Sequence, residues 1–215
     1  MVFIEVMAEV FDFLAAYAVM LPREGWVCEV ETINNRLFEQ LGVNPNRWDY
    51  LVDELVAKYM FSREIEIETK RMFGKIYTTP FVMLEGAEAG LELIEGTGVP
   101  IGIVTHADVE WTWRKYKWLD LARFVNRDEV YIVDPNGHKT KDSWREAMAY
   151  FGLVPDQCVV VGDSPRSDIN PARELGVKHC ILVEDKNQWS VHHQEVDEGV
   201  KRVSKLSEIP EILLG

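Results

Sequence analysis

The stretch VVVGDSPRSDINPARELG, residues 159–176, decides how the rest of the chain is interpreted. It opens with a short apolar run that ends at Gly162, and such a run between polar residues and chain breakers is typical of a buried parallel strand. Asp163 follows directly, and the residues from Pro171 to Gly176 predict the end of a helix. A carboxylate thus stands where a predicted strand ends, which is where open parallel sheets bind their ligands.

Strands and helices alternate on both sides of this stretch. Apolar runs predict strands at Pro100–His106, at Glu129–Asp134, at Gln157–Asp163 and from His179 onward. Helical patterns predict helices between these strands, among them Lys141–Phe151, and a terminal helix at Ser207–Leu214. The alternation predicts a three-layer α/β fold, in which a parallel sheet carries helices on both faces.

The N-terminal part of the chain shows a different pattern of apolar residues. Residues Val2 to Phe13 are rich in β-branched and aromatic side chains, which predicts a further strand. After the breakers at 21–25, apolar residues recur at helical spacing as far as Phe73, with no predicted strand between them. We therefore expect a core formed by residues 1–20 and 80–215, and an all-helical insertion at 21–79.

The charge and composition of the chain argue against some classes of binding partner. The chain has 36 acidic against 23 basic residues and a formal net charge of −13, with no basic stripe, which argues against nucleic acid and anionic membranes. Acidic residues interrupt the apolar N-terminal run, so we expect neither a signal peptide nor a membrane span. Three scattered cysteines without a CxxC pair favour a reducing, cytoplasmic location. The oligomeric state is left open.

Polar side chains gather at the predicted strand ends. Asp12, Thr105 and Asp163 each follow an apolar run, and Lys139 stands in the loop before the helix that leads to the Asp163 strand. Carboxylates are ligands that Mg²⁺ prefers, and a hydroxyl and an ammonium can neutralise phosphoryl oxygens. The pattern therefore predicts a site for Mg²⁺ and the phosphate of a small phosphorylated metabolite.

These segments resemble, in order, the motifs of the haloacid dehalogenase-like hydrolase superfamily. GIVTHAD (102–108) resembles the second motif, GHKTKDSWREAMAYFGL (137–153) the third, and VVVGDSPRSDI (159–169) the fourth. The resemblance implies a Rossmannoid core, a helical cap at 21–79 that closes over the site, and phosphoryl transfer through an aspartyl-phosphate.

The resemblance also implies roles for single residues. Thr105 and Lys139 would bind the phosphate and act in catalysis, although Lys141 competes with Lys139 because the usual lysine-proline pair is missing. Asp163 and Asp168 would bind the metal. His106 and Ser164 would line the phosphate pocket, with His106 at its rim.

The first motif departs from the family pattern. VFDFLAAYA (10–18) would keep Asp12 as the nucleophile and a metal ligand, and Leu14 would offer the metal its backbone carbonyl. Leu14 replaces the usual acid/base aspartate, however, and Ala15 and Ala16 replace the usual Gly-Thr pair. A second register would place Glu5 at the nucleophile. Because leucine cannot transfer a proton, a step that contributes roughly 10²–10⁴-fold, we expect weak activity.

Two functions therefore compete at this level. The first is a Mg²⁺-dependent phosphatase with a degenerate first motif. The second is a catalytically inactive binding or regulatory protein that retains the cradle for phosphate and metal.

Overall fold

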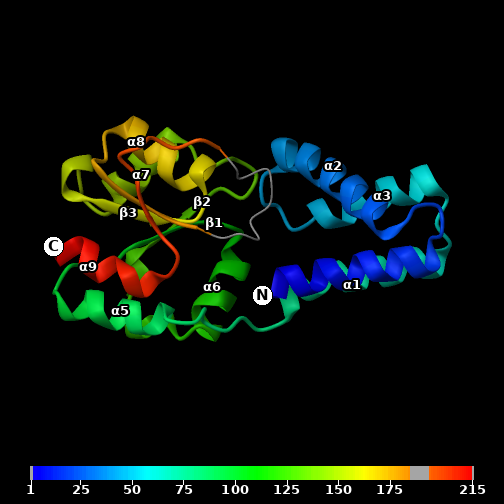
Figure 1. Ribbon diagram of the computed structural model, residues 1–215, viewed down its shortest axis with the longest axis horizontal. Helices are drawn as coiled ribbons and strands as arrows, with labels where there is room; N and C mark the ends of the chain where they lie inside the picture. The colour runs from blue at the N-terminus through cyan, green and yellow to red at the C-terminus, as the bar shows by residue number, and fades with distance from the viewer. Residues whose placement is uncertain (1, 185–193, 215) are drawn as a thin grey trace. The chain divides into compact units, whose positions relative to one another are not determined.

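The computed structural model describes residues 2–184 and 194–214. The chain divides into two compact units (Figure 1). The helical unit comprises residues 1–81 together with the short turn 135–137, and the α/β unit comprises residues 82–134 and 138–215.

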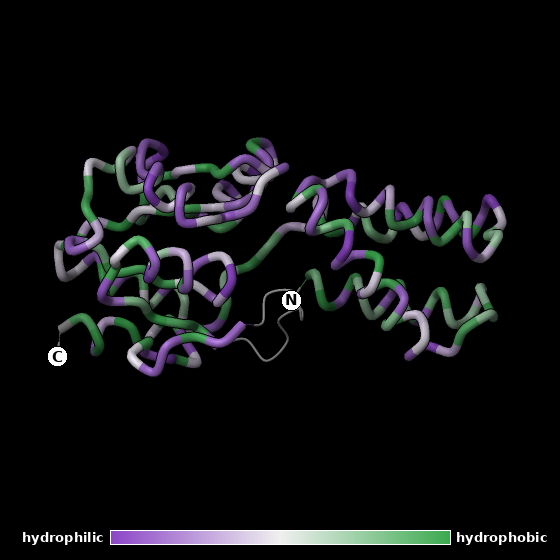
Figure 2. The backbone as a smooth tube through the Cα atoms, turned by 90° about the horizontal axis from the view of Figure 1, so that it is seen from above, coloured by the Kyte–Doolittle hydropathy of each residue, from purple (hydrophilic) through white to green (hydrophobic). Residues whose placement is uncertain are grey.

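The described part of the helical unit contains the four helices α1 (Val2–Tyr17), α2 (Arg23–Leu41), α3 (Arg47–Tyr59) and α4 (Arg63–Thr78). Hydrophobic and hydrophilic residues alternate along these helices (Figure 2), as expected when one face of each helix packs on the others. Trp26, Leu51, Leu55 and Phe73 are almost fully buried between them. The helices predicted within 21–79 are therefore present.

The prediction of a strand at Val2–Phe13 is wrong, because this segment lies within helix α1. The buried residues of α1 include Val2, Val6, Val10 and Leu14, each one helical turn after the last. They form a continuous apolar stripe that packs on the other helices, and this packing outweighs the strand preference of β-branched side chains.

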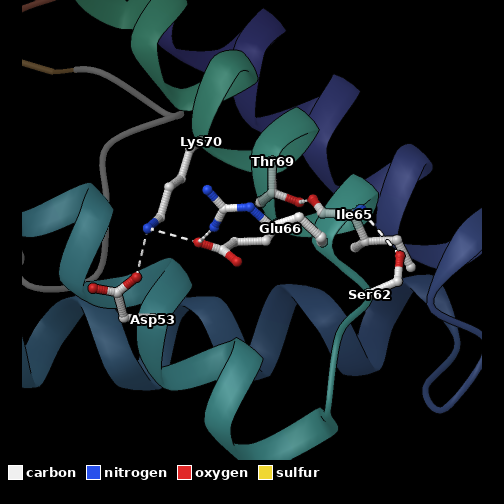
Figure 3. A network of polar contacts seen from close by, with 7 residues as sticks. Asp53, Ser62, Ile65, Glu66, Thr69 and Lys70 are labelled. Atoms are coloured by element: carbon white, nitrogen blue, oxygen red, sulfur yellow. Dashed lines mark hydrogen bonds and ion pairs between the residues drawn. The ribbon is translucent and has the colours of Figure 1, made fainter.

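Ion pairs and caps tie the helices of this unit together. The Lys70 ammonium lies between Asp53 of α3, at 2.6 Å, and Glu66 of α4, at 3.1 Å (Figure 3). At the start of α4 the Ser62 hydroxyl accepts a hydrogen bond from the Ile65 N–H. α4 is thus fixed to α3 on its polar side as well as through its apolar face.

The turn 135–137 packs against the end of α2. Gly42 has φ +60°, and an added Cβ would overlap the carbonyl oxygens of Pro135 and Gly137. The Val43 N–H donates to the Pro135 carbonyl at 3.0 Å. Glycine is needed here for the left-handed backbone and for the close approach.

The α/β unit has five described strands, all paired in parallel: β1 (Ile103–His106), β2 (Val130–Val133), β3 (Val159–Gly162), β4 (His179–Val183) and β5 (Lys201–Val203). Its helices are α5 (Ala87–Gly96), α6 (Val109–Trp118), α7 (Lys141–Tyr150), α8 (Asn170–Leu175) and α9 (Ile209–Leu214). The fold class is therefore confirmed as mixed α/β with parallel pairing. The described strands form two sheets, β1-β2 and β3-β4-β5, where a single sheet was expected.

Successive side chains of β4 point to opposite faces of its sheet. Cys180 and Leu182 pack with residues of α7 and α8, whereas Ile181 packs with Val203 and with Ile209 of α9. Figure 1 shows the same layers, with α7 and α8 on one side of the strands and α5 and α9 on the other. This is the expected three-layer arrangement.

The structure differs from the sequence-based division at the N-terminus and in one strand. Residues 1–20 belong to the helical unit and not to the core, because α1 packs on α2 and α4. Strand β5 was not predicted, since its sequence KRV is short and mostly charged. None of the described helices is both long and apolar enough to cross a membrane.

Candidate phosphate-binding site

A buried ion pair joins the ends of the two sheets of the α/β unit. The Lys139 ammonium lies 2.5 Å from the Asp168 carboxylate, and the two side chains are only 10% and 9% exposed. The same ammonium donates to the Val104 carbonyl of β1 at 3.1 Å and lies over the Trp144 ring of α7. Lys139 thus links β1 to the turn that follows β3.

That turn is built by the sequence GDSPRSD. A single π-helical turn, Pro165–Ile169, follows β3, and the Ser164 hydroxyl caps it by accepting from the Ser167 N–H at 3.1 Å. The Ser164 N–H in turn donates to the Asp168 carboxylate at 3.1 Å. A Cβ at Gly162 would overlap the Asp168 side chain, so glycine leaves the room that this carboxylate needs.

Thr105 and His106 form the last residues of β1, at the same edge. Thr105 is half-buried there. The rings of His106 and His138 are 6.4 Å apart, which shows that the end of β1 and the loop carrying Lys139 converge. The roles of Thr105, His106 and Ser164 in phosphate binding stay predictions.

The two competing lysines occupy different settings. Lys139 is buried against Asp168, whereas Lys141 is the exposed first residue of α7. The Thr140 hydroxyl, between the two lysines, caps α7 by accepting from the Ser143 N–H. The geometry therefore favours Lys139.

The carboxylates at this edge suit a hard cation only in part. Asp163 is exposed directly after β3, and both oxygens of Asp168 accept hydrogen bonds. In the described part of the chain no group of three or more His, Cys, Asp or Glu side chains is arranged to hold a metal. Mg²⁺ commonly binds through one or two carboxylates and takes its other oxygens from water and substrate phosphate, so by its chemistry Asp163 is a suitable ligand, whereas Asp168 is already engaged.

Asp12 does not lie at the end of a strand, the position on which its predicted role as nucleophile depends. It lies on α1 in the helical unit, where its exposed carboxylate pairs with Arg23 at 2.5 Å. The expected strand end does not exist there. Leu14 is fully buried within the same helix, and so its carbonyl is not at a strand end either. The alternative Glu5 lies on α1 as well.

Sequence reasoning missed Lys115 on α6. This half-buried lysine lies over the Trp111 ring at 5.4 Å, and burial together with the positive charge of Lys139 lowers its pKa. The spacing of Trp111 and Lys115, one helical turn, was the only signal, and it indicates a contact without indicating a function.

Comparisons with known proteins agree with the fold. Residues 32–182 match the haloacid dehalogenase-like hydrolase family. A glyceraldehyde 3-phosphate phosphatase from Pyrococcus furiosus is 28% identical over 168 residues, which cover 73% of this chain and 66%, just under two thirds, of that protein.

Solved structures show the same architecture. A haloacid dehalogenase-like family hydrolase from Xanthomonas campestris matches with a TM-score of 0.78 at 13% identity, covering 99% of this chain and 83% of that one. The Bacillus subtilis protein YfnB, solved bound to magnesium, matches with a TM-score of 0.71 at 13% identity, covering 99% and 93%. With the family match spanning most of the sequence, this chain belongs to the haloacid dehalogenase-like hydrolases.

Proposed function

We propose that this protein is a Mg²⁺-dependent phosphatase of weak activity that acts on a small phosphorylated metabolite. The buried Lys139–Asp168 pair at the joined strand ends carries the proposal, because it fixes an ammonium, a group that binds phosphoryl oxygens, against β1. The similarity to a glyceraldehyde 3-phosphate phosphatase supports a phosphate ester as the class of substrate.

Each residue of the site would contribute one interaction. The Lys139 ammonium and the Thr105 hydroxyl would bind phosphoryl oxygens, and Asp168 would orient Lys139 through their ion pair. Asp163 would hold Mg²⁺, which supplies positive charge as negative charge shifts during phosphoryl transfer. Weak turnover is expected because Asp12 is not a strand-end carboxylate and Leu14 cannot carry a proton.

Hydrolysis of an aryl phosphate in the presence of Mg²⁺ tests this proposal. An aryl leaving group needs little acid assistance, so the loss of the acid/base aspartate should matter least for it. We expect slow turnover that chelation of Mg²⁺ abolishes, and a loss of about 10²-fold in Lys139→Met. Lys141→Met is the matched control and should keep its activity. No turnover, or equal turnover in Lys139→Met, would overturn the proposal.

The helical setting of Asp12 favours a second candidate, a binding protein that holds phosphate and Mg²⁺ without hydrolysis. The variant Asp12→Ala tests whether Asp12 is the nucleophile, and it leaves the residues that would bind phosphate and Mg²⁺ unchanged. Because the Asp12 carboxylate is paired with Arg23 on the surface of the helical unit, we expect this variant to retain any turnover. The second candidate would be supported if calorimetry detects binding of phosphate with Mg²⁺ and no phosphate ester tested is hydrolysed.

A further inference from the structure

A cavity of about 210 Å³ lies in the α/β unit between α9 and the edge where strands β3, β4 and β5 begin. Val159, His179 and Lys201 are the first residues of these strands, and all three line the cavity. At about 3.3 Å per residue, β3 places Val159 roughly 10 Å from Gly162, where the turn of the candidate phosphate site begins. The cavity therefore lies at the opposite edge of the sheet from that site.

One part of the cavity lining is apolar. The strand register places four lining side chains on one face of the sheet, namely Val159, His179, Ile181 and Lys201. Ile181 packs with residues of α9 on that face, and Ile212 and Leu213 of the same helix line the cavity as well. Val159 nevertheless remains 42% exposed. A ligand that covers this apolar surface would gain free energy from its burial.

The polar side chains of the lining are basic, namely Lys178, His179 and Lys201. None of the described residues that line the cavity is acidic, although the whole chain has a net charge of −13. Lys178 forms an exposed ion pair with Asp156 at 3.0 Å, whereas Lys201 forms none with any residue that the structure describes. The exposed His179 ring can donate a further hydrogen bond. The rim of the cavity thus suits a negatively charged group.

We propose that this cavity binds a small carboxylate with an apolar body. The carboxylate of the ligand would contact Lys201 and His179, while its apolar body would cover Val159 and pack against α9. At about 30 Å³ per water, the cavity has the volume of about seven waters, which limits the ligand to a small molecule. The inference is independent of the proposed phosphatase function, because the residues of the candidate phosphate site do not line this cavity.

Nuclear magnetic resonance titration of the full chain with sodium benzoate tests this inference. We expect the backbone amide signals of His179 and Lys201 to shift as benzoate binds. Benzamide keeps the ring without the charge, and acetate keeps the charge without the ring. Because each lacks one of the two proposed interactions, each should bind at least about fivefold more weakly than benzoate.

Two pairs of variants test the charged and the apolar part of the lining separately. Lys201→Met should weaken benzoate binding about fivefold, whereas Lys205→Met removes an exposed lysine just beyond β5, outside the cavity lining, and should not. Val159→Phe would fill the cavity and should abolish binding. Val161→Phe is its matched control, because Val161 is exposed on the same face of β3 without lining the cavity. Urea unfolding establishes that each variant is folded.

The inference is wrong if benzoate does not bind, if benzamide binds equally well, or if folded Val159→Phe retains the wild-type affinity. The position of the shifted amide signals separates this cavity from the candidate phosphate site. If the signals of Thr105 and Ser164 shift while those of His179 and Lys201 do not, benzoate occupies the phosphate site and the inference is equally wrong.

Discussion

Lys139 and Asp168 form the ion pair on which the site depends. Because both side chains are about nine-tenths buried, removing one partner leaves the other charge unpaired in a poorly solvated place. We expect Lys139→Met and Asp168→Asn each to lower the free energy of unfolding by about 3–5 kcal/mol, measured by urea denaturation.

The control for this prediction is the exposed pair between Lys178 and Asp156, whose side chains are 70% and 67% exposed. Lys178→Met should cost no more than about 1 kcal/mol. Equal, small losses in the buried and the exposed pair would contradict the assignment of Lys139 as a buried, paired cation.

The site also depends on Gly162. In Gly162→Ala the new methyl group would push against Asp168 and shift the partner of Lys139. We expect phosphate affinity to fall at least about tenfold, because a displaced carboxylate no longer orients the ammonium. Gly96→Ala is the matched control, since a Cβ there meets no neighbouring atom within 4 Å. Normal phosphate binding by Gly162→Ala, measured by calorimetry, would show that the Gly162–Asp168 contact is unimportant.

The cysteines provide an independent check on the packing of the α/β unit. Burial raises the pKa of Cys180 to about 11, whereas Cys28 is exposed in the helical unit. The thiolate is the reactive form, so at neutral pH iodoacetamide should modify Cys28 and leave Cys180 intact. Mass spectrometry of the alkylated protein measures this, and rapid modification of Cys180 in the folded protein would contradict its position in the core.

The helical conformation of α1 predicts different effects for substitutions at Asp12 and Leu14. In a strand, Asp12 and Leu14 would share a face, but in a helix they lie about 200° apart. Leu14 is fully buried and Asp12 is exposed. Leu14→Ala should therefore destabilise the protein by about 2–5 kcal/mol, and Asp12→Asn by less than about 1 kcal/mol. Similar urea midpoints for the two variants would contradict the helix.

The same helix shows how far the sequence predicts the elements. Its β-branched and aromatic composition favours a strand, while the spacing of Val2, Val6, Val10 and Leu14 favours a helix. Spacing was the better guide because burial of one continuous stripe outweighs the small propensity of single residues. Strands β1 to β4 were predictable because each is an apolar run between breakers, whereas the charged edge strand β5 carries no such pattern.

The candidate site was predictable where local sequence determines it. The turn after β3 follows from its own glycine, serine and proline residues, so Asp163 and Ser164 were found. Lys139 was found only together with Lys141, because burial of one of the two depends on contacts with β1 and Asp168.

At the scale of the whole molecule, membership of the haloacid dehalogenase-like hydrolases accounts for the α/β unit and for the helical unit without specifying the reaction. The segments that resemble the second, third and fourth motifs lie in the α/β unit, while the candidate first motif is a helix in the other unit. We therefore propose that phosphate binds in the α/β unit, at the ends of β1 and β3.

A crystal structure of the full chain grown with Mg²⁺ and inorganic phosphate would test directly whether phosphate binds at this strand edge. We predict a phosphate within hydrogen-bond distance of the Lys139 ammonium and the Thr105 hydroxyl, with Mg²⁺ bound to the Asp163 carboxylate. A structure in which this strand edge holds only water, at a phosphate concentration that saturates the protein in solution, would contradict it.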